Sequence, residues 1–517
     1  MARPDSGGGG RSHRGGQQAQ PLAGCPAGAS KDAEHGTRQV DLLESTRREP
    51  VAPKLIPQAQ DVPSIVIGGL VIEGDDPERL LDGQQQPLCL AGLFDGRGRA
   101  ENRLRCLGER LDDLYLNRGV VGVSGPAHAR QPTSRGVDLP KGYRDSVDFE
   151  FSADQESLRD TVRRFLNDKA PLQPYVREQL LDERGTSPAV WSGLAQLGVT
   201  GLLAPAALGG AGMGMVEMGV VLEEMGRLVH PGPFLSSAVG AVSAVCLVAT
   251  DEQRAELVPG LADGSTVGAL AFLENVTRGD WRAPTVLAEG ANESWKLRGT
   301  KTPVLDACAA GLLFVTASTP DGLGLFAADP ASVGISIQPQ AGFDATRKAA
   351  TVTFSNSEAR RLGDGSDITE AVSAVVDRMV IGLVTDAVGA AEVALHMAVA
   401  YAKERMQFDR PIGSFQAVQH LCADMLQVVE QARAGAYYAL WAADAAPPGE
   451  RHRAATMAKA FSADALFRVG ASTVQVLGGV GFTWEHDAHL YYKRLMTLQE
   501  AYGGATEHLE ELARLVI

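Results

Sequence analysis

The stretch YAKERMQFDRPIGSFQAVQH, residues 401–420, carries the strongest signal in the sequence of this chain. It follows a long segment whose apolar residues recur at helical spacing, and the basic side chain of Arg405 marks the end of that helix. Phe408, a Pro-Ile-Gly turn, Phe415 and Gln416 come next, and helical spacing then resumes. The stretch therefore joins two helices and gathers a guanidinium, two aromatic rings and an amide into one short connection.

A second signal is QVLGGVGF, residues 475–482, in which Gly478 and Gly479 follow another helical segment. Such a turn exposes backbone amides and can accept a phosphate or the edge of a nucleotide. On its own, a Gly-rich helix ending is more often a simple C-cap. The turn therefore indicates a nucleotide site only in combination with the first stretch.

Together, and in this order, the two segments resemble the acyl-CoA dehydrogenase family. The family pattern Arg-x-x-Phe-Gly-x-x-Ile-Gly-x-Phe-Gln is present over residues 405–416, with Asp409 at the family's usual glycine. The pattern Gln-x-x-Gly-Gly-x-Gly is present over residues 475–481. The resemblance covers about residues 148–517 of the chain.

The resemblance implies FAD as the cofactor and a role for each motif residue. Arg405 would bind the pyrophosphate of an FAD held by a neighbouring subunit, because a guanidinium is always charged and forks its donors. Phe408 would pack near the adenine. Taken singly, either phenylalanine would be interpreted as a core residue, and only the joint spacing favours the nucleotide role. The same nucleotide pocket would be lined by Phe415, Gln416, Gln475, Gly478 and Gly479.

The activity implied by the resemblance is α,β-desaturation of an acyl-CoA thioester. A carboxylate removes the α-proton while the β-hydrogen leaves as hydride to the flavin, and hydrogen bonds polarise the thioester oxygen. The family also implies an electron-transfer flavoprotein as electron acceptor. A flavin contacted across subunits implies a homo- or hetero-oligomer, either a dimer or a tetramer.

The usual base of the family is missing. AYGGATEHLEEL, residues 501–512, lies where most members read Tyr-Glu-Gly-Thr, and that glutamate is the usual base. Aligning Tyr502 with the family tyrosine puts Gly503 in the place of the glutamate. Some members carry the base on the first long helix of the C-terminal block, just before an arginine, and here Asp377 and Arg378 occupy that position.

Asp377 and Arg378 are therefore the catalytic candidates. Asp377 lies in an apolar helical run, where an acid is costly unless it has a function or a partner. A local ion pair is the competing interpretation. Asp is also one methylene shorter than Glu, and a misplacement of about 1 Å can cost roughly 100-fold in rate. Arg378 would either contact substrate or organise the site.

Three functions remain open from the residues. The chain is a competent dehydrogenase that uses Asp377, a non-catalytic or half-site subunit of a hetero-oligomeric dehydrogenase, or a flavin monooxygenase on the same fold. On the flavin side, Glu274 of the family's Thr-Glu-Pro is kept, but Asn275 replaces the proline and Gly279-Asp280 replaces Gly-Ser. The small residues at 503–505 leave room for a bulky or branched acyl group, although the sequence does not identify it.

Hydrophobic patterning divides the chain into four parts. Residues 1–147 are rich in Gly, Arg, Gln and Pro, so we expect them to be disordered, or to reflect a start codon assigned too far upstream. Residues 148–266 are helical, 267–365 have the period of strands, and 366–517 are helical again. This order predicts an α+β protein with an N-terminal helical domain, a small central β-barrel or sandwich, and a C-terminal antiparallel four-helix bundle.

The composition of the 517 residues narrows the class of protein. Hydrophobic residues make up 44% and charged residues 21%, which is ordinary for a globular protein. The net charge of −15 argues against nucleic acid or an anionic membrane as partner. Six cysteines without a CxxC pair argue against a metal site or a disulfide framework and favour the cytoplasm. No uninterrupted apolar run has the length of a membrane span.

Overall fold

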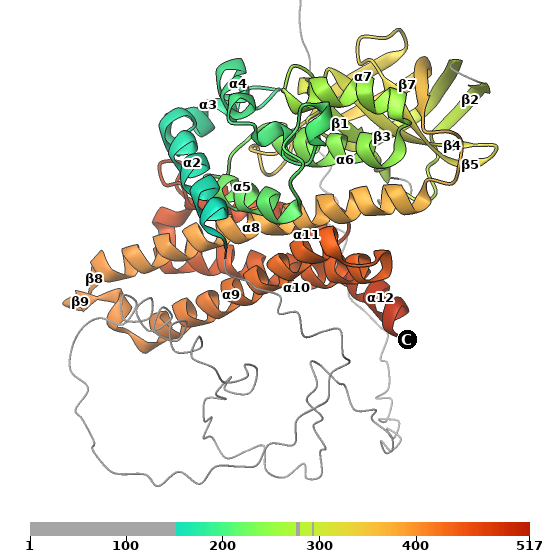
Figure 1. Ribbon diagram of the computed structural model, residues 1–517. Helices are drawn as coiled ribbons and strands as arrows, with labels where there is room; N and C mark the ends of the chain where they lie inside the picture. The colour runs from blue at the N-terminus through green and yellow to red at the C-terminus, as the bar shows by residue number, and fades with distance from the viewer. Residues whose placement is uncertain (1–150, 276–279, 292–293) are drawn as a thin grey trace, which may run out of the picture. The chain divides into compact units, whose positions relative to one another are not determined.

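The computed structural model describes residues 151–275, 280–291 and 294–517. The predictions made for residues 1–147 and for Gly279 lie outside these ranges. In chain order, helices are followed by a mixed sheet and then by helices, which confirms the predicted α+β order (Figure 1).

The N-terminal part begins at the capping box that the sequence predicts. The Ser152 hydroxyl accepts a hydrogen bond from the Gln155 amide at 3.2 Å, and the Gln155 side chain accepts one from the Ser152 amide at 2.9 Å. The helix that starts there is α2 (Ala153–Lys169). The remaining helices are α3 (Arg177–Gln179), α4 (Pro188–Gln196), α5 (Met215–Arg227), α6 (Val242–Val248) and α7 (Asp251–Ala262), with short helical turns η2 (Leu172–Val176), η3 (Val199–Gly201), η4 (Ala206–Leu208) and η5 (Leu235–Ala241).

The central part is a seven-stranded sheet in the order β1-β4-β2-β3-β7-β5, with β6 paired to β7. Because β4 also pairs with β5, the pairing closes on itself through β2, β3 and β7. The β1–β4 and β2–β4 pairs are parallel and the others antiparallel. The strands are β1 (Gly268–Ala271), β2 (Leu287–Ala291), β3 (Ser294–Leu305), β4 (Leu312–Thr319), β5 (Gly322–Ala328), β6 (Ile335–Gln340) and β7 (Ala349–Leu362), with the turn η7 (Ala307–Ala309) after β3.

The sequence did not predict β6. This strand pairs only with β7, and most of its residues are exposed. An edge strand tolerates a proline such as Pro339, which interrupts the pattern that identified the other strands.

The C-terminal part contains five helices. The first three, α8 (Thr369–Glu404), α9 (Gln416–Ala445) and α10 (Pro448–Leu477), pack against one another and are joined by short connections, so the chain reverses direction twice. The C-terminal ends of α8 and α10 therefore lie at the same end of the helices, and their N-terminal ends lie at the other. The remaining elements are β8 (Met406–Gln407), β9 (Arg410–Pro411), η8 (Ile412–Ser414), η9 (Gly478–Phe482), α11 (Ala488–Glu500) and α12 (Ala505–Val516).

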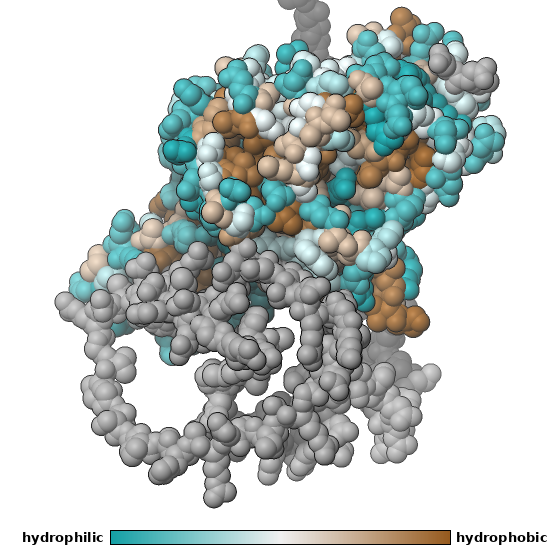
Figure 2. Space-filling view, in the orientation of Figure 1, coloured by the Kyte–Doolittle hydropathy of each residue, from teal (hydrophilic) through white to brown (hydrophobic). Residues whose placement is uncertain are grey.

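Helix α10, continued by η9, is long and apolar enough by composition to span a membrane. Half of its most apolar window is buried inside the protein, and α10 packs against α8, α9, α11 and α12. We therefore interpret it as a core helix. A different apolar surface lies at the C-terminal end of α12, where Val516 and Ile517 are exposed (Figure 2).

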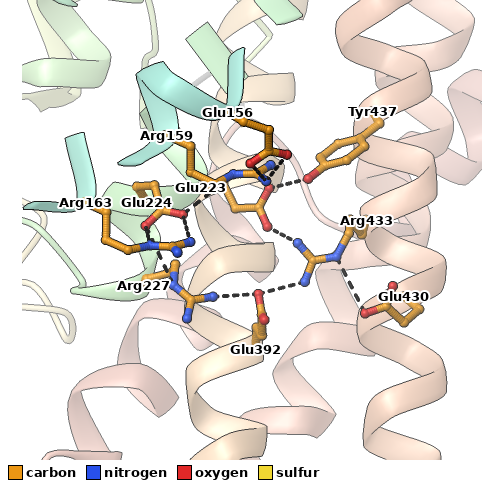
Figure 3. A network of polar contacts seen from close by, with 10 residues as sticks. All are labelled: Glu156, Arg159, Arg163, Glu223, Glu224, Arg227, Glu392, Glu430, Arg433 and Tyr437. Carbon is orange, nitrogen blue, oxygen red and sulfur yellow. Dashed lines mark hydrogen bonds and ion pairs between the residues drawn. The ribbon is translucent and has the colours of Figure 1, made fainter. Parts of the chain in front are cut away.

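A charged network joins the N-terminal helices to the C-terminal ones (Figure 3). Glu223 and Glu224 of α5 are buried, and a buried carboxylate needs partners. Arg163 of α2 binds Glu224 at 2.7 Å, while Tyr437 of α9 donates to Glu223 at 2.6 Å. Arg433 of α9 contacts Glu223 as well, so α5 is held from both sides. The full network comprises Glu156, Arg159, Arg163, Glu223, Glu224, Arg227, Glu392, Glu430, Arg433 and Tyr437.

A second network, centred on Arg494 of α11, connects all three parts of the described chain. The buried guanidinium binds Asp344, which follows β6, at 2.9 Å, and Asp386 of α8 at 2.8 Å. It also donates to the backbone carbonyls of Val229 and His230 in the N-terminal part. Ion pairs and hydrogen bonds of one side chain thus link the sheet to both sets of helices.

Candidate active site

A pocket of about 240 Å³ opens near the N-terminal ends of α8 and α10. Both sequence positions that were considered for a base, Asp377 of α8 and Gly503 before α12, line this one pocket. These two positions are far apart in the chain, and the fold places both in the wall of one pocket. The lining residues are Asp280, Trp281, Arg282, Val376, Asp377, Val380, His452, Ala455, Thr456, Tyr502, Gly503, Glu507, His508, Glu510, Glu511 and Arg514.

The turn that carries Gly503 is held by a buried lysine. Lys459 of α10 donates to the carbonyl of Gly503 at 2.6 Å and to that of Leu498 at 2.7 Å. Burial lowers the pKa of Lys459 to about 8. The backbone at Tyr502 and Gly503 is left-handed, with φ of +58° and +96°. Lys459 could not be identified from the sequence, because its hydrogen-bond partners are backbone carbonyls.

Replacing Gly503 with Ala is expected to lower the free energy of unfolding by about 1–2 kcal/mol. A left-handed φ disfavours any side chain, and the new Cβ would lie 3.3 Å from Nε2 of His508. Chemical denaturation followed by circular dichroism measures the change. Gly435→Ala is the matched control, because a Cβ there meets open space within helix α9, where Ala is preferred by about 0.5–1 kcal/mol. Equal effects of the two substitutions would contradict the strained turn.

Asp377 is buried and fully engaged. Its Oδ2 accepts from Nε of Arg451 at 2.8 Å, and its Oδ1 lies 2.7 Å from Nδ1 of His452. Only 4% of the Asp377 side chain is exposed. Asp377 thus forms an ion pair, although with Arg451 of another helix and not with the local partner considered from the sequence, and it also lines the pocket. Arg451 and His452 begin α10, and no spacing in the sequence connects them to Asp377.

His452 lies between two carboxylates. Its Nδ1 faces Asp377, and its Nε2 is 3.3 Å from Oε1 of Glu511 on α12. The hydrogen bond to Asp377 raises the pKa of His452, against the opposing effect of burial. Although burial acts to raise the pKa of Glu511, the hydrogen bonds from His452 and Arg514 bring it below its ordinary value. The pocket therefore contains a compact acid–base cluster built from three helices.

Arg378 points elsewhere. Its guanidinium donates to the Ser243 hydroxyl of α6 at 3.2 Å, and its largely buried side chain is not part of the pocket wall. Burial lowers the pKa of Arg378. The structure brings Asp377 to the pocket and does not bring Arg378 there.

The motif residues of the 401–420 stretch lie at the other end of α8. Arg405 follows the last residue of α8, about 42 Å from Asp377 at about 1.5 Å per helical residue. The ring of Phe408 is 84% exposed and lies 5.9 Å from that of Phe415, edge to face. Gln416, which begins α9, is exposed. Among the described residues, the Arg405 guanidinium has no hydrogen-bond or ion-pair partner.

Gln475, Gly478 and Gly479 are exposed at the C-terminal end of α10, the same end as Arg405. Gly478 has a φ of +63°, which turns the chain out of the helix. An unpaired guanidinium, one exposed aromatic ring and accessible backbone have the chemistry that the nucleotide half of FAD requires. They lie a helix length away from the Asp377 pocket.

On the sheet side, Glu274, at the position of the family's glutamate, has partners within the central part of the chain. Glu274 is buried in an ion pair with Lys301, with Oε1 and Nζ 2.7 Å apart, and it also accepts from the Thr285 amide at 2.8 Å. Burial lowers the pKa of Lys301 to about 8. The Glu274 carboxylate therefore binds other residues of this part, Lys301 of β3 and Thr285 just before β2. Asp280 lines the pocket described above.

Comparison with known proteins gives the following matches. Residues 152–265 match the model of the acyl-CoA dehydrogenase N-terminal domain, and residues 369–515 match that of the acyl-CoA dehydrogenase C-terminal domain. The chain is 31% identical to the acyl-CoA dehydrogenase IpdE2 of Mycobacterium tuberculosis, over 68% of this chain and 92% of the relative.

Two solved structures are similar to the chain at comparable length. One is a variant of the Tcur3481-Tcur3483 steroid ACAD, with a TM-score of 0.65 and 33% identity, over 70% of this chain and 97% of that one. The other is the ChsE4-ChsE5 complex from Mycobacterium tuberculosis, with a TM-score of 0.65 and 26% identity, over 71% of this chain and 98% of that one.

Proposed function

This chain belongs to the acyl-CoA dehydrogenase family and is an acyl-CoA dehydrogenase, and on that premise we propose that it performs FAD-dependent α,β-dehydrogenation at the Asp377 pocket. One observation carries this assignment. The residue at the family's usual base position, Gly503, and the carboxylate at the alternative position, Asp377, line the same pocket. The acid–base function is thus relocated within one site. We further propose that α8, α9, α10 and α11 form the antiparallel four-helix bundle of the family.

The proposed mechanism assigns the α-proton to the Asp377–His452 pair. When bound, FAD supplies the acceptor for the β-hydride. Arg405, Gln475 and the Gly478–Gly479 turn bind the nucleotide half of a flavin that a neighbouring subunit holds. Arg451 donates from Nε to the Asp377 carboxylate at 2.8 Å and so holds it in place beside His452. The chain's own contribution is orientation, proton removal and the exclusion of water.

We propose that the acyl group is bulky. After Tyr502, which lines the pocket, the turn continues with three small residues, Gly503, Gly504 and Ala505, so no long side chain takes up the space at these three positions. A similar solved structure is a steroid ACAD, which supports a fused-ring or branched acyl group for this chain too. We expect an electron-transfer flavoprotein to reoxidise the flavin.

A second candidate role is that of one subunit in a hetero-oligomeric dehydrogenase. Gly503 replaces the usual base, and Glu274 on the sheet side is held by Lys301 instead of facing a flavin. The Arg405 end nevertheless remains available to another chain. The ChsE4-ChsE5 complex, with two different chains, is a similar structure. In such an assembly this chain would complete a partner's flavin site.

The visible spectrum of the chain expressed alone separates these roles. For a self-sufficient enzyme we expect stoichiometric flavin absorbance that bleaches when acyl-CoA is added without oxygen. A chain without flavin that gains it only on co-expression with a partner supports the hetero-oligomer. Flavin that stays oxidised with acyl-CoA, and reacts only with a reductant and oxygen, contradicts the dehydrogenase assignment and favours a monooxygenase.

A further inference from the structure

His452 holds a position that sequence comparison with the family's base did not indicate. It lies in the first turns of α10, and its ring nitrogens face Asp377 of α8 at 2.7 Å and Glu511 of α12 at 3.3 Å. The ring is the one imidazole between two carboxylates in the described pocket wall. Three helices therefore converge on it.

The exposure of these groups shows which of them reaches the pocket. The Asp377 side chain is 4% exposed, and each of its oxygens is already bonded, to Arg451 and to His452. The His452 side chain is 21% exposed. A substrate carbon in the pocket can approach the imidazole more readily than it can approach the carboxylate behind it.

The hydrogen-bond chemistry determines which nitrogen of His452 can accept a proton. An ionised carboxylate only accepts hydrogen bonds, so Nδ1 carries the proton that points to Asp377. In the neutral ring Nε2 then has the free lone pair. A carboxylate behind Nδ1 orients the ring and stabilises the imidazolium that forms when Nε2 takes up a proton.

Glu511 occupies the place that the substrate would need. It lies 3.3 Å from Nε2 of His452, but it also binds Arg514 at 2.8 Å and Arg282 at 3.4 Å. Its side chain is 25% exposed. When the side chain turns toward these arginines, Nε2 becomes free and the displaced carboxylate keeps its partners.

We propose that Nε2 of His452 accepts the substrate α-proton, and that Asp377 is the positioning residue that holds the ring and balances its charge. The inference rests on the proposed dehydrogenation. The Cα–H bond breaks and the N–H bond forms, while the electron pair moves into the enolate of the thioester. FAD, when bound, would supply the acceptor for the β-hydride and thus take the two electrons that the substrate loses, and His452 ends as imidazolium.

The charges around His452 set its response to pH. Asp377 binds the ring directly, and Arg451 with its second partner Glu370 lies behind Asp377. The other charged or titratable groups of the pocket wall are Glu507, His508, Glu510, Glu511 and Arg514 of α12, Tyr502, and Asp280 and Arg282 before β2. The hydrogen bond to Asp377 is the largest influence and raises the pKa of His452. The protonated ring therefore stabilises the fold below the ordinary histidine value, and this stabilisation disappears as pH rises through the raised pKa. The rate of proton removal must rise over that same range.

The first test measures His452 itself and needs no flavin. In isotope-labelled protein, the His452 ring is expected to titrate above the ordinary histidine value in NMR spectra, with Nδ1 protonated in the neutral form. Asp377→Asn should lower that pKa. A ring that titrates at or below the ordinary value, or that ignores Asp377→Asn, overturns the proposal whatever the flavin chemistry is.

The second test measures anaerobic flavin bleaching by acyl-CoA in the flavin-loaded protein, with any partner chain that is needed for loading. His452→Gln is expected to slow bleaching about 100-fold or more and to remove the rise with pH, since a positioned general base contributes about 10²–10⁴-fold. His396→Gln, an exposed histidine in the middle of α8, is the matched control. If His452→Gln bleaches within about threefold of the wild type, while Asp377→Asn does not bleach, Asp377 is the base and the proposal fails. If the wild type itself does not bleach, the proposed function fails, and the catalytic role of His452 fails with it.

Discussion

Asp377→Asn is expected to lower the rate of flavin reduction by acyl-CoA by about 10²–10⁴-fold while the protein stays folded. The substitution is nearly isosteric, but it replaces an ionised carboxylate with an amide. Arg451 then loses a buried counter-ion at 2.8 Å, and His452 loses the group that favours its imidazolium form. Stopped-flow measurement of bleaching at several pH values gives the result.

Two further substitutions make this expectation specific. Glu370→Gln removes the other carboxylate partner of Arg451, 2.8 Å away and largely exposed, and should change the rate little. Asp377→Glu keeps the charge and should retain more activity than Asp377→Asn, although its longer side chain shifts the ring. Equal loss in all three variants would indicate a structural effect of disturbing Arg451, and full activity in Asp377→Asn would exclude a role for the Asp377 charge in proton removal.

Arg494→Leu is expected to have the largest effect on stability, lowering the free energy of unfolding by about 3–5 kcal/mol. The guanidinium is buried and neutralises Asp344 and Asp386, which would be left buried with one cation fewer. Arg347 still forms an ion pair with Asp386 at 2.9 Å, so the larger loss of charge compensation falls on Asp344. Chemical denaturation measures the loss.

Arg360→Leu is the matched control, because its pair with Glu256 is exposed and such surface pairs contribute about 0–1 kcal/mol. If Arg494→Leu does not accumulate as folded protein, Arg494→Leu combined with Asp344→Asn is expected to recover part of the stability by removing the uncompensated charge. A loss below about 1 kcal/mol for Arg494→Leu, or no recovery in the double variant, would contradict the role given to this network.

The sequence predicts best what is local in the chain. The capping box of α2 involves residues three apart, and the structure confirms it. The long helices α8, α9 and α10 follow from periodicity. The motif over residues 405–416 is contiguous, so its resemblance to a family pattern is readable without a structure, while its assigned contacts to FAD stay predictions. Strand β6 was not predicted, because an exposed edge strand has only a weak hydrophobic pattern.

The candidate site was predicted in part, since Asp377 was singled out and lines the pocket. His452 and Glu511 were not, because they lie on two other helices and their contacts join residues 75 and 59 positions apart. Nothing in Arg-His-Arg at the start of α10 distinguishes a pocket residue from a solvated helix end. Lys459 was missed for a different reason. Its hydrogen-bond partners are backbone carbonyls, so no second side chain in the sequence indicates its role.

The way in which Lys459 holds its turn has an evolutionary consequence. Its ammonium group binds the carbonyls of Leu498 and Gly503, so the shape of the turn is secured through atoms that every amino acid shares. With the acid–base pair on α8 and α10, a change of side chain in the turn that keeps this backbone shape leaves the proton chemistry unaltered. Selection can therefore adjust the size of the acyl group that is admitted at the turn independently of the residues that react with it.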